Sequence, residues 1–141
     1  MTTTTLFTTK ASATGGRQGK AVTEDGTLNL DFSMPGSGKP GTNPEQLFAL
    51  GYAACFGGAV AAAARAKGVE VGEVKINSEV SLFKGDDGFS IAVVLDAVLT
   101  GVDQAVAAEL AKTAHHEICP YSKATRNNIP VTVKANGQPV E

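Results

Sequence analysis

The side chains with the clearest capacity for chemistry are the only two cysteines of the 141-residue chain, Cys55 and Cys119. The first residues contain no basic stretch followed by an apolar run, so we expect no signal peptide and a cytoplasmic location. In a reducing compartment two cysteines are not expected to form a structural disulfide. A bond between them would be catalytic or regulatory, so the pair suggests redox chemistry without defining it.

The two thiols have different sequence surroundings. Cys55 follows Ala53 and Ala54 in a segment of mostly small residues, where a cysteine is most often a small buried hydrophobic residue. Cys119 directly precedes Pro120, which places it at the expected N-terminus of a short helix. At that position the helix dipole favours a thiolate over a thiol. Cys119 is therefore the more suggestive of the two, but its position alone is not specific.

A reactive thiolate also needs a positive charge nearby, and the chain has arginines at 17, 65 and 126. Arg17 follows a turn formed by Gly15 and Gly16. Glu45 falls in the first turn of the helix expected to carry Cys55, where an acidic side chain ordinarily complements the dipole. Its functional alternative is to hold an arginine against a thiolate through a bidentate ion pair.

Helix geometry constrains that alternative. Ten helical residues separate Glu45 from Cys55 by about 15 Å, so the two cannot share a site within one straight helix. They can meet if two copies of the helix cross antiparallel near Leu50 and Gly51. The functional role of Glu45 therefore predicts a homodimer.

The elements that must position these residues start with β-structure. A hairpin with its turn at Gly15-Gly16 and a third strand are followed by a long helix, with Asn43 as N-cap and Gly68 at its end. The expected strands are 6–14, 17–23, 28–32, 71–84, 89–99 and 129–134, and the expected helices are 44–67, 103–117 and 120–126. This order, βββ-α-ββ-α-β, predicts a single α+β domain over residues 1–141.

The long helix contains Gly51, Gly57 and Gly58, each of which disfavours a helix by up to about 1 kcal/mol relative to alanine. Two explanations remain open: close packing on the chain's own sheet, or close packing against the same helix of a second copy. The segment consists mostly of small residues and is followed by Arg65 and Lys67, so we do not expect it to span a membrane.

Other functions have weaker signals. The net charge of −2, with no basic stripe, argues against a nucleic-acid partner. His115 and His116 precede Cys119, but adjacent helical residues point about 100° apart and no further ligand pair completes a metal site. We expect these histidines to be partly exposed near a helix C-terminus, and we expect no bound metal.

Two segments, Asn43–Phe56 and Cys119–Ile129, together with the Gly-Gly-Arg turn at 15–17, resemble the organic hydroperoxide resistance proteins of the Ohr/OsmC family. The resemblance covers essentially the whole chain. It implies an intertwined homodimer with antiparallel sheets wrapped around a long central helix and with two sites at the subunit interface. It also implies an enzyme that reduces organic hydroperoxides to alcohols without metal, haem or flavin.

The resemblance further assigns roles to individual residues. Cys55 matches the peroxidatic cysteine, Cys119 the resolving cysteine that forms a disulfide with it, and Arg17 and Glu45 the family's arginine and glutamate. The implied reductant is a dihydrolipoyl group, usually carried on a lipoylated protein. For the apolar substrate pocket we consider Met34, Phe48 and Phe56, which are equally compatible with an ordinary core.

The sequence leaves three alternatives open. The chain could be an OsmC-type peroxidase with a different peroxide preference. It could be a redox sensor or an apolar-ligand-binding module that does not turn over. Both cysteines could also be buried and inert.

Overall fold

The structure is a computed structural model that describes residues 2–141. The chain divides into two compact units, one ending at Leu47 and one comprising Phe48–Glu141. The expectation of a single domain stays a prediction.

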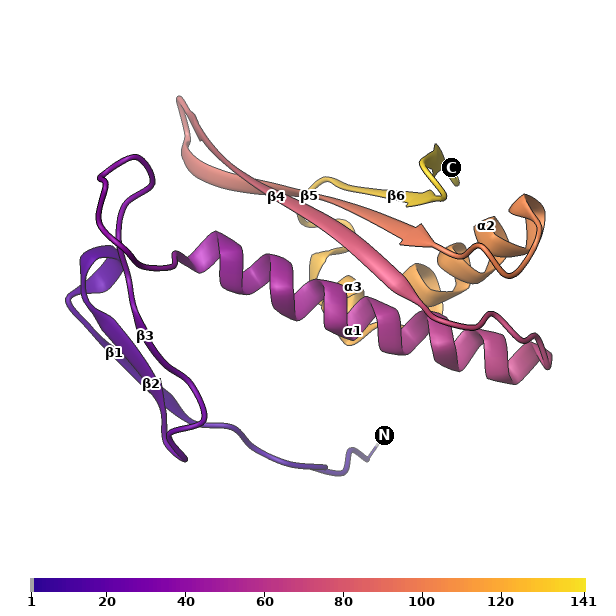
Figure 1. Cartoon of the computed structure of the whole chain (residues 1–141), viewed down its shortest axis with the longest axis horizontal. Helices are drawn as coiled ribbons and strands as arrows, with labels where there is room; N and C mark the ends of the chain where they lie inside the picture. The colour runs from indigo at the N-terminus through magenta and orange to yellow at the C-terminus, as the bar shows by residue number, and fades with distance from the viewer. Residues whose placement is uncertain (1) are drawn as a thin grey trace. The chain divides into compact units, whose positions relative to one another are not determined.

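The first unit contains a three-stranded antiparallel sheet. Its strands are β1 (Ala11–Thr14), β2 (Lys20–Thr23) and β3 (Asn29–Asp31), in the order β1-β2-β3 (Figure 1). The expected hairpin and third strand are confirmed, but β1 begins at Ala11 and is therefore shorter than the predicted strand 6–14.

Arg17 lies in the loop that closes this hairpin. A short 3₁₀ turn, η1 (Gly16–Gln18), follows Gly15, and the two glycines have φ of 83° and 60°. These left-handed values favour glycine, which has no Cβ to oppose them. At the far side of the loop, a Cβ on Gly19 would collide with the carbonyl oxygen of Thr14. The backbone around Arg17 is therefore tightly constrained.

Helix α1 (Pro44–Lys67) begins in the first unit and continues through the second as one uninterrupted helix. The side chain of Asn43 accepts a hydrogen bond from the N–H of Gln46 at 2.8 Å, which confirms the predicted N-cap. Gln46 does not complete the reciprocal bond of a capping box; its side-chain oxygen accepts from the hydroxyl of Thr42 at 2.7 Å. Gly68, at φ 67°, terminates the helix as expected.

The second unit contains a four-stranded sheet in the order β4-β5-β6-β7. The long hairpin of β4 (Lys75–Gly85) and β5 (Gly88–Val98) is antiparallel, but β6 (Val131–Ala135) pairs with β5 in parallel. This parallel pair corrects the expectation of purely antiparallel sheets: the chain crosses over between β5 and β6 through helices and returns in the same direction. The short β7 (Gln138–Pro139) was not expected.

The crossover contains three helical segments. They are α2 (Gln104–Thr113), the π-helical turn η2 (Ala114–Ile118) and α3 (Pro120–Thr125). Asp103 caps α2 by accepting from the N–H of Val106 at 2.9 Å. The predicted helix at 103–117 thus ends earlier, because its last turn widens into η2.

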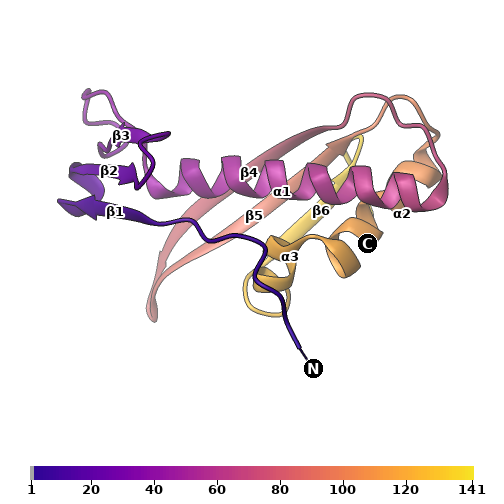
Figure 2. The same ribbon diagram turned by 90° about the horizontal axis from the view of Figure 1, so that it is seen from below.

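One face of α1 forms part of the core of the second unit. Figures 1 and 2 show this helix crossing one face of the β4-β5-β6 sheet, with α3 beside it. The core combines large side chains from the helix, from β5 and from α2, including Tyr52, Phe56, Val60, Val93, Leu95 and Leu110. Burial of these side chains fixes the rotation of α1 about its axis, and hence the direction in which Cys55 points.

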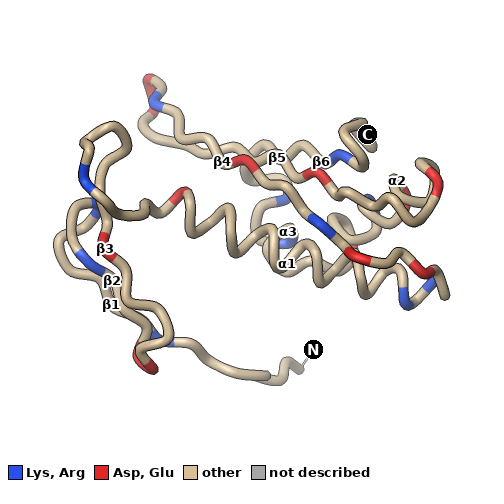
Figure 3. The backbone as a smooth tube through the Cα atoms, in the orientation of Figure 1, with Lys and Arg blue, Asp and Glu red and all other residues tan. Residues whose placement is uncertain are grey.

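The opposite face of α1 is apolar and uncovered. Leu50 is 69% exposed, and Ala54 and Gly58 follow it at four-residue spacing, also exposed. Figure 3 shows that α1 carries charge only near its ends. By length and composition alone α1 could cross a membrane, a criterion that helices in the cores of globular proteins also meet. The expectation that it does not span one stays a prediction.

Candidate active site

The two cysteines, far apart in sequence, meet in the second unit. The sulfur of Cys119 lies 3.4 Å from the sulfur of Cys55, and both cysteines are free. A disulfide bond is about 2.05 Å long, so this is a pair of thiols within reach of one another. Cys119 is almost fully buried and Cys55 is partly exposed. Cys55 is therefore the sulfur that an external molecule can reach.

The segment after α2 brings Cys119 to this position. The backbone N–H of Cys119 donates to the carbonyl of Ala114 across η2 at 2.8 Å, which closes the widened turn. Cys119 then adopts an extended conformation and caps α3, with Pro120 at the start of the helix. Its sulfur accepts a hydrogen bond from the N–H of Ser122 at 3.4 Å. The predicted cap-like position of Cys119 is confirmed.

Three influences act on the ionisation of Cys55. Burial raises the pKa of its thiol, the backbone N–H of Tyr121 opposes this by stabilising the thiolate, and the neighbouring Cys119 raises the pKa further. None of these groups is a cation. The surroundings of Cys55 in the second unit thus favour the thiol, and a reactive thiolate needs positive charge from elsewhere.

Arg17 and Glu45 form a bidentate ion pair in the first unit. The two terminal guanidinium nitrogens of Arg17, Nη1 and Nη2, donate to the two carboxylate oxygens of Glu45 at 2.6 and 2.8 Å. Hydrogen bonding to Arg17 lowers the pKa of Glu45, and the same bonds raise the pKa of Arg17. This is the fork-to-fork geometry expected from the sequence. Whether the pair meets Cys55 stays a prediction.

Aromatic rings gather close to Cys55. Tyr121, whose N–H faces the Cys55 sulfur, stacks on Phe48 with ring centres 6.1 Å apart and lies 5.7 Å from the ring of Tyr52. A Cβ on Gly51 would come within 3.0 Å of the Tyr121 hydroxyl, so this glycine leaves room for the tyrosine. Tyr121 is 39% exposed and offers apolar surface that the sequence did not single out.

The three residues considered for a substrate pocket have different surroundings. Phe48 belongs to this aromatic group. Phe56 is completely buried in the core. Met34 lies in a loop of the first unit and is 43% exposed. Of the three, Phe48 is the one whose contacts connect it to the residues around Cys55.

The other two glycines of α1 differ in their surroundings. A Cβ on Gly57 would make an ordinary contact with Ile76 at 3.4 Å, whereas a Cβ on Gly58 would meet nothing within 4 Å. Packing against Tyr121 therefore explains why position 51 is a glycine. No contact among the described residues explains the glycine at position 58.

A buried polar network lies next to Cys119. The hydroxyl of Tyr52 is 2.8 Å from that of Ser122 and 2.9 Å from that of Thr125, and Nδ1 of His115 is 2.7 Å from the Ser122 hydroxyl. His115 is only 6% exposed, which corrects the expectation of a partly exposed histidine. Its neighbour His116 instead pairs with Glu141 at the surface.

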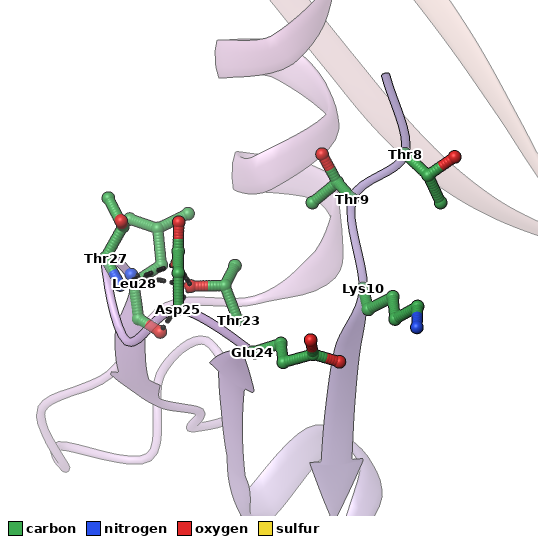
Figure 4. A pocket seen from close by; sticks show the side chains of 8 residues that line it. All are labelled: Thr8, Thr9, Lys10, Thr23, Glu24, Asp25, Thr27 and Leu28. Carbon is green, nitrogen blue, oxygen red and sulfur yellow. Dashed lines mark hydrogen bonds between the residues drawn. The ribbon is translucent and has the colours of Figure 1, made fainter. Parts of the chain in front are cut away.

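Two further features of the chain do not form a site. Within residues 2–141, no group of three or more His, Cys, Asp or Glu residues is arranged to hold a metal ion. A surface cavity of about 590 Å³ in the first unit is lined mainly by threonines, with Lys10, Glu24, Asp25 and Leu28 (Figure 4). Its Asp25 carboxylate accepts hydrogen bonds from Thr23 and Thr27 within its own turn. This arrangement accounts for the turn and supplies no nucleophile.

Comparison with known proteins defines the class to which this fold and cysteine pair belong. Residues 36–134 match the family model described as OsmC-like protein, and the chain belongs to this family. Among its relatives is the organic hydroperoxide resistance protein OhrB of Bacillus subtilis (strain 168), 48% identical over 134 residues that cover 92% of this chain and 97% of OhrB.

Two further comparisons agree with this result. The organic hydroperoxide resistance protein of Xanthomonas axonopodis pv. citri (strain 306) is 48% identical, with 91% of this chain and 93% of that protein covered. The crystal structure of B. subtilis OhrB superposes with a TM-score of 0.88 at 46% identity, covering 93% of this chain and 99% of that chain. The α+β fold and the resemblance to organic hydroperoxide resistance proteins are confirmed.

Proposed function

We propose that the protein is a cytoplasmic, cysteine-based peroxidase that reduces organic hydroperoxides to alcohols. The observation that carries the proposal is the 3.4 Å separation of the Cys55 and Cys119 sulfurs, one partly exposed and the other buried. The names of the relatives, which describe resistance to organic hydroperoxides, support the same substrate class.

In the first step the Cys55 thiolate attacks the terminal oxygen of the hydroperoxide, R–O–O–H. The O–O bond breaks, the alkoxide leaves and takes up a proton to become the alcohol, and Cys55 becomes a sulfenic acid. Aromatic surface from Phe48 and Tyr121 beside the thiol suits an apolar R group better than it suits hydrogen peroxide.

In the second step Cys119 attacks the sulfur of the Cys55 sulfenic acid. The S–O bond breaks, the oxygen leaves as water with the proton of the Cys119 thiol, and a Cys55–Cys119 disulfide forms. This bond protects Cys55 from irreversible oxidation. A dithiol of the dihydrolipoyl type, free or on a lipoylated protein, then reduces the disulfide by exchange and is itself oxidised to a disulfide.

The pair of Arg17 and Glu45 supplies the missing positive charge. The pKa of Cys55 is raised by burial, and a guanidinium beside it would favour the thiolate and stabilise the leaving alkoxide. Glu45 holds both terminal guanidinium nitrogens, so the cation has a fixed orientation.

A homodimer provides the route by which this pair reaches the thiol. Glu45 and Cys55 lie ten residues apart on one continuous helix, and the exposed face of α1 at Leu50, Ala54 and Gly58 can receive the same helix of a second copy. Gly58, which has open space at its Cβ position, permits close approach there. We propose that Glu45 and Arg17 of one protomer complete the site of Cys55 in its partner.

Steady consumption of peroxide with dihydrolipoamide as reductant tests the proposal. Cumene hydroperoxide should be consumed catalytically and much faster than hydrogen peroxide, and Cys55→Ser should abolish consumption. Equal rates with the two peroxides would identify a peroxidase of different preference. Oxidation of one equivalent without turnover would identify a sensor and overturn the proposal.

A further inference from the structure

The hydrogen-bonded network beside Cys119 supplies no reacting atom to the attack on the hydroperoxide or to the formation of the disulfide. Ser122 is its centre, bonded to both Tyr52 and His115, and Tyr52 is bonded in turn to Thr125. All four side chains are at least 94% buried. Burial of polar groups is unfavourable unless they are hydrogen-bonded, and a comparable apolar core would avoid the requirement altogether. The position of this network next to the cysteine pair therefore suggests that it serves the chemistry of the two thiols.

One choice of hydrogen-bond directions lets every hydroxyl of the network both donate and accept. Each hydroxyl has one proton to donate, and Thr125 donates its proton to the carbonyl of Ser122 at 3.3 Å. The Thr125 oxygen therefore accepts from Tyr52, Tyr52 accepts from Ser122, and Ser122 accepts the Nδ1–H of His115. This is the tautomer in which every hydroxyl donates and accepts once. It agrees with the finding that, in the described part of the chain, no buried side-chain nitrogen or oxygen lacks a partner.

Ser122 links this network to the thiol. Its side chain is held from two sides by Tyr52 and His115, and its backbone N–H donates to the Cys119 sulfur at 3.4 Å. The segment is secured at both ends, since the Cys119 N–H bonds to Ala114 and the Arg126 side chain donates to the His115 carbonyl. Fixing the Ser122 side chain therefore fixes the direction of the N–H that meets the sulfur.

We propose that Ser122, His115 and Tyr52 are positioning residues for the resolving step, which hold the Cys119 sulfur against Cys55 and direct the Ser122 N–H at it. The inference rests on the proposed function, because the step concerned is the attack of Cys119 on the Cys55 sulfenic acid. As Cys119 gives up its proton to the departing water, negative charge develops on its sulfur, and the N–H donor stabilises that charge. The attack of Cys55 on the hydroperoxide does not use the network.

The test separates the two steps. Reduced wild type, Ser122→Ala, His115→Ala and His115→Asn are mixed with cumene hydroperoxide, and the loss of the Cys55 thiol and the formation of the disulfide are timed separately by rapid quenching and intact mass. His115→Asn is the matched control because its amide can place a donor near the position of Nδ1. Val93→Ala, which truncates a buried side chain of β5, controls for a general loss of stability.

Ser122→Ala and His115→Ala should slow disulfide formation about fivefold, in line with the loss of one hydrogen bond, and leave the peroxide step unchanged. The fraction of Cys55 converted to sulfinic acid by excess hydroperoxide should rise in the same two variants. His115→Asn should restore disulfide formation toward the wild-type rate. Disulfide formation at the wild-type rate in both alanine variants, or equal slowing of both steps as in Val93→Ala, would overturn the proposal.

A second oxidant keeps this inference separate from the proposed function. Diamide oxidises a pair of thiols without any peroxidase activity. It first adds to one thiol, and the second thiol then attacks that sulfur, forms the disulfide and releases diamide in its reduced form. The same variants should slow the diamide-driven disulfide by a similar factor. If wild type does not react with hydroperoxide but the variants still slow the diamide-driven disulfide, the proposed peroxidase activity is refuted and the positioning network is retained. Equal rates of diamide-driven disulfide formation in wild type and all variants would refute the positioning network.

Discussion

The sulfur of Cys119 receives the N–H of Ser122 and lies 3.4 Å from the sulfur of Cys55, although 64 residues separate the two cysteines in the chain. The two sulfurs have unequal access, because Cys119 is 1% exposed while Cys55 is partly open. This unequal access suits the two proposed steps: the exposed sulfur of Cys55 attacks the hydroperoxide, and the buried sulfur of Cys119 then attacks the Cys55 sulfenic acid.

Replacement of the buried cysteine should separate these two events. Cys119→Ser should reduce one equivalent of cumene hydroperoxide and then stop under a dithiol that reacts through the disulfide, because no disulfide can form. Excess hydroperoxide should drive Cys55 to the sulfinic acid, visible by intact mass. Cys55→Ser is the control and should leave the hydroperoxide unreacted. Sustained turnover by Cys119→Ser at the wild-type rate would show that Cys119 does not resolve.

The proposed placement of the Arg17–Glu45 pair beside the partner's Cys55 predicts a change in thiol ionisation. Arg17→Ala should raise the pKa of Cys55 by about 1–3 pH units, since an opposite charge within a few ångströms favours the thiolate by that much. Titration of the thiolate absorbance, with Cys119→Ser as background to isolate one thiol, measures the shift. Arg65→Ala is the matched control, an exposed arginine at the far end of α1. An unchanged pKa of Cys55 in Arg17→Ala would show that the ion pair does not lie beside the thiol.

Two glycines of α1 offer a matched test of the proposed dimer. In the chain alone Gly58→Ala has open space and should stabilise the helix by up to about 1 kcal/mol, whereas Gly51→Ala must displace the Tyr121 ring. If a second copy packs at Gly58, the added methyl group should instead weaken the dimer, seen as a concentration-dependent loss of mass in sedimentation. A Gly58→Ala protein that is more stable and equally dimeric would place the interface elsewhere.

Buried His115 predicts a specific dependence of stability on pH. Burial lowers its pKa, and the nearby His116 and Arg126 lower it further. The unfolded chain, with an ordinary histidine pKa of about 6.5, then binds a proton at a pH where the folded protein does not. The free energy of unfolding should therefore fall as the pH drops through about 6.5 toward the folded pKa.

His115→Asn should remove this component of the pH dependence. Urea denaturation at pH 7 and pH 5, at one protein concentration, should show a smaller loss of stability between the two values in the variant than in wild type. His116→Asn is the control at the adjacent, exposed position. Identical losses in wild type and His115→Asn would contradict the assignment of a neutral, buried histidine.

Local signals in the sequence predicted the elements that begin and end in characteristic residues. Asn43 and Gly68 mark the ends of α1, and the turn at Gly15-Gly16 marks the first hairpin; the structure contains all three features. The Arg17–Glu45 pair was expected from the chemistry of two side chains that match in geometry and from the family resemblance.

Features that depend on distant parts of the chain were harder to predict. The parallel pairing of β6 with β5 is set by a crossover of three helical segments, which hydrophobic pattern alone does not reveal. The burial of His115 depends on η2, where the widened turn directs one of two adjacent histidines inward toward Ser122. A cluster of hydroxyl residues after Cys119, together with a tyrosine on the long helix predicted over 44–67, was the signal available for that network.

Cys119 has one further consequence through its place at the start of α3. Its sulfur accepts the N–H of Ser122 in the first turn of that helix, so a change in the sulfur's bonding acts on the hydrogen bond that caps residues 120–125. We expect oxidation of the thiol pair to weaken this cap and so to loosen the six-residue segment. The redox state of the protein would thereby become readable from outside, as a difference in amide exchange or in cleavage by a protease at a single short helix.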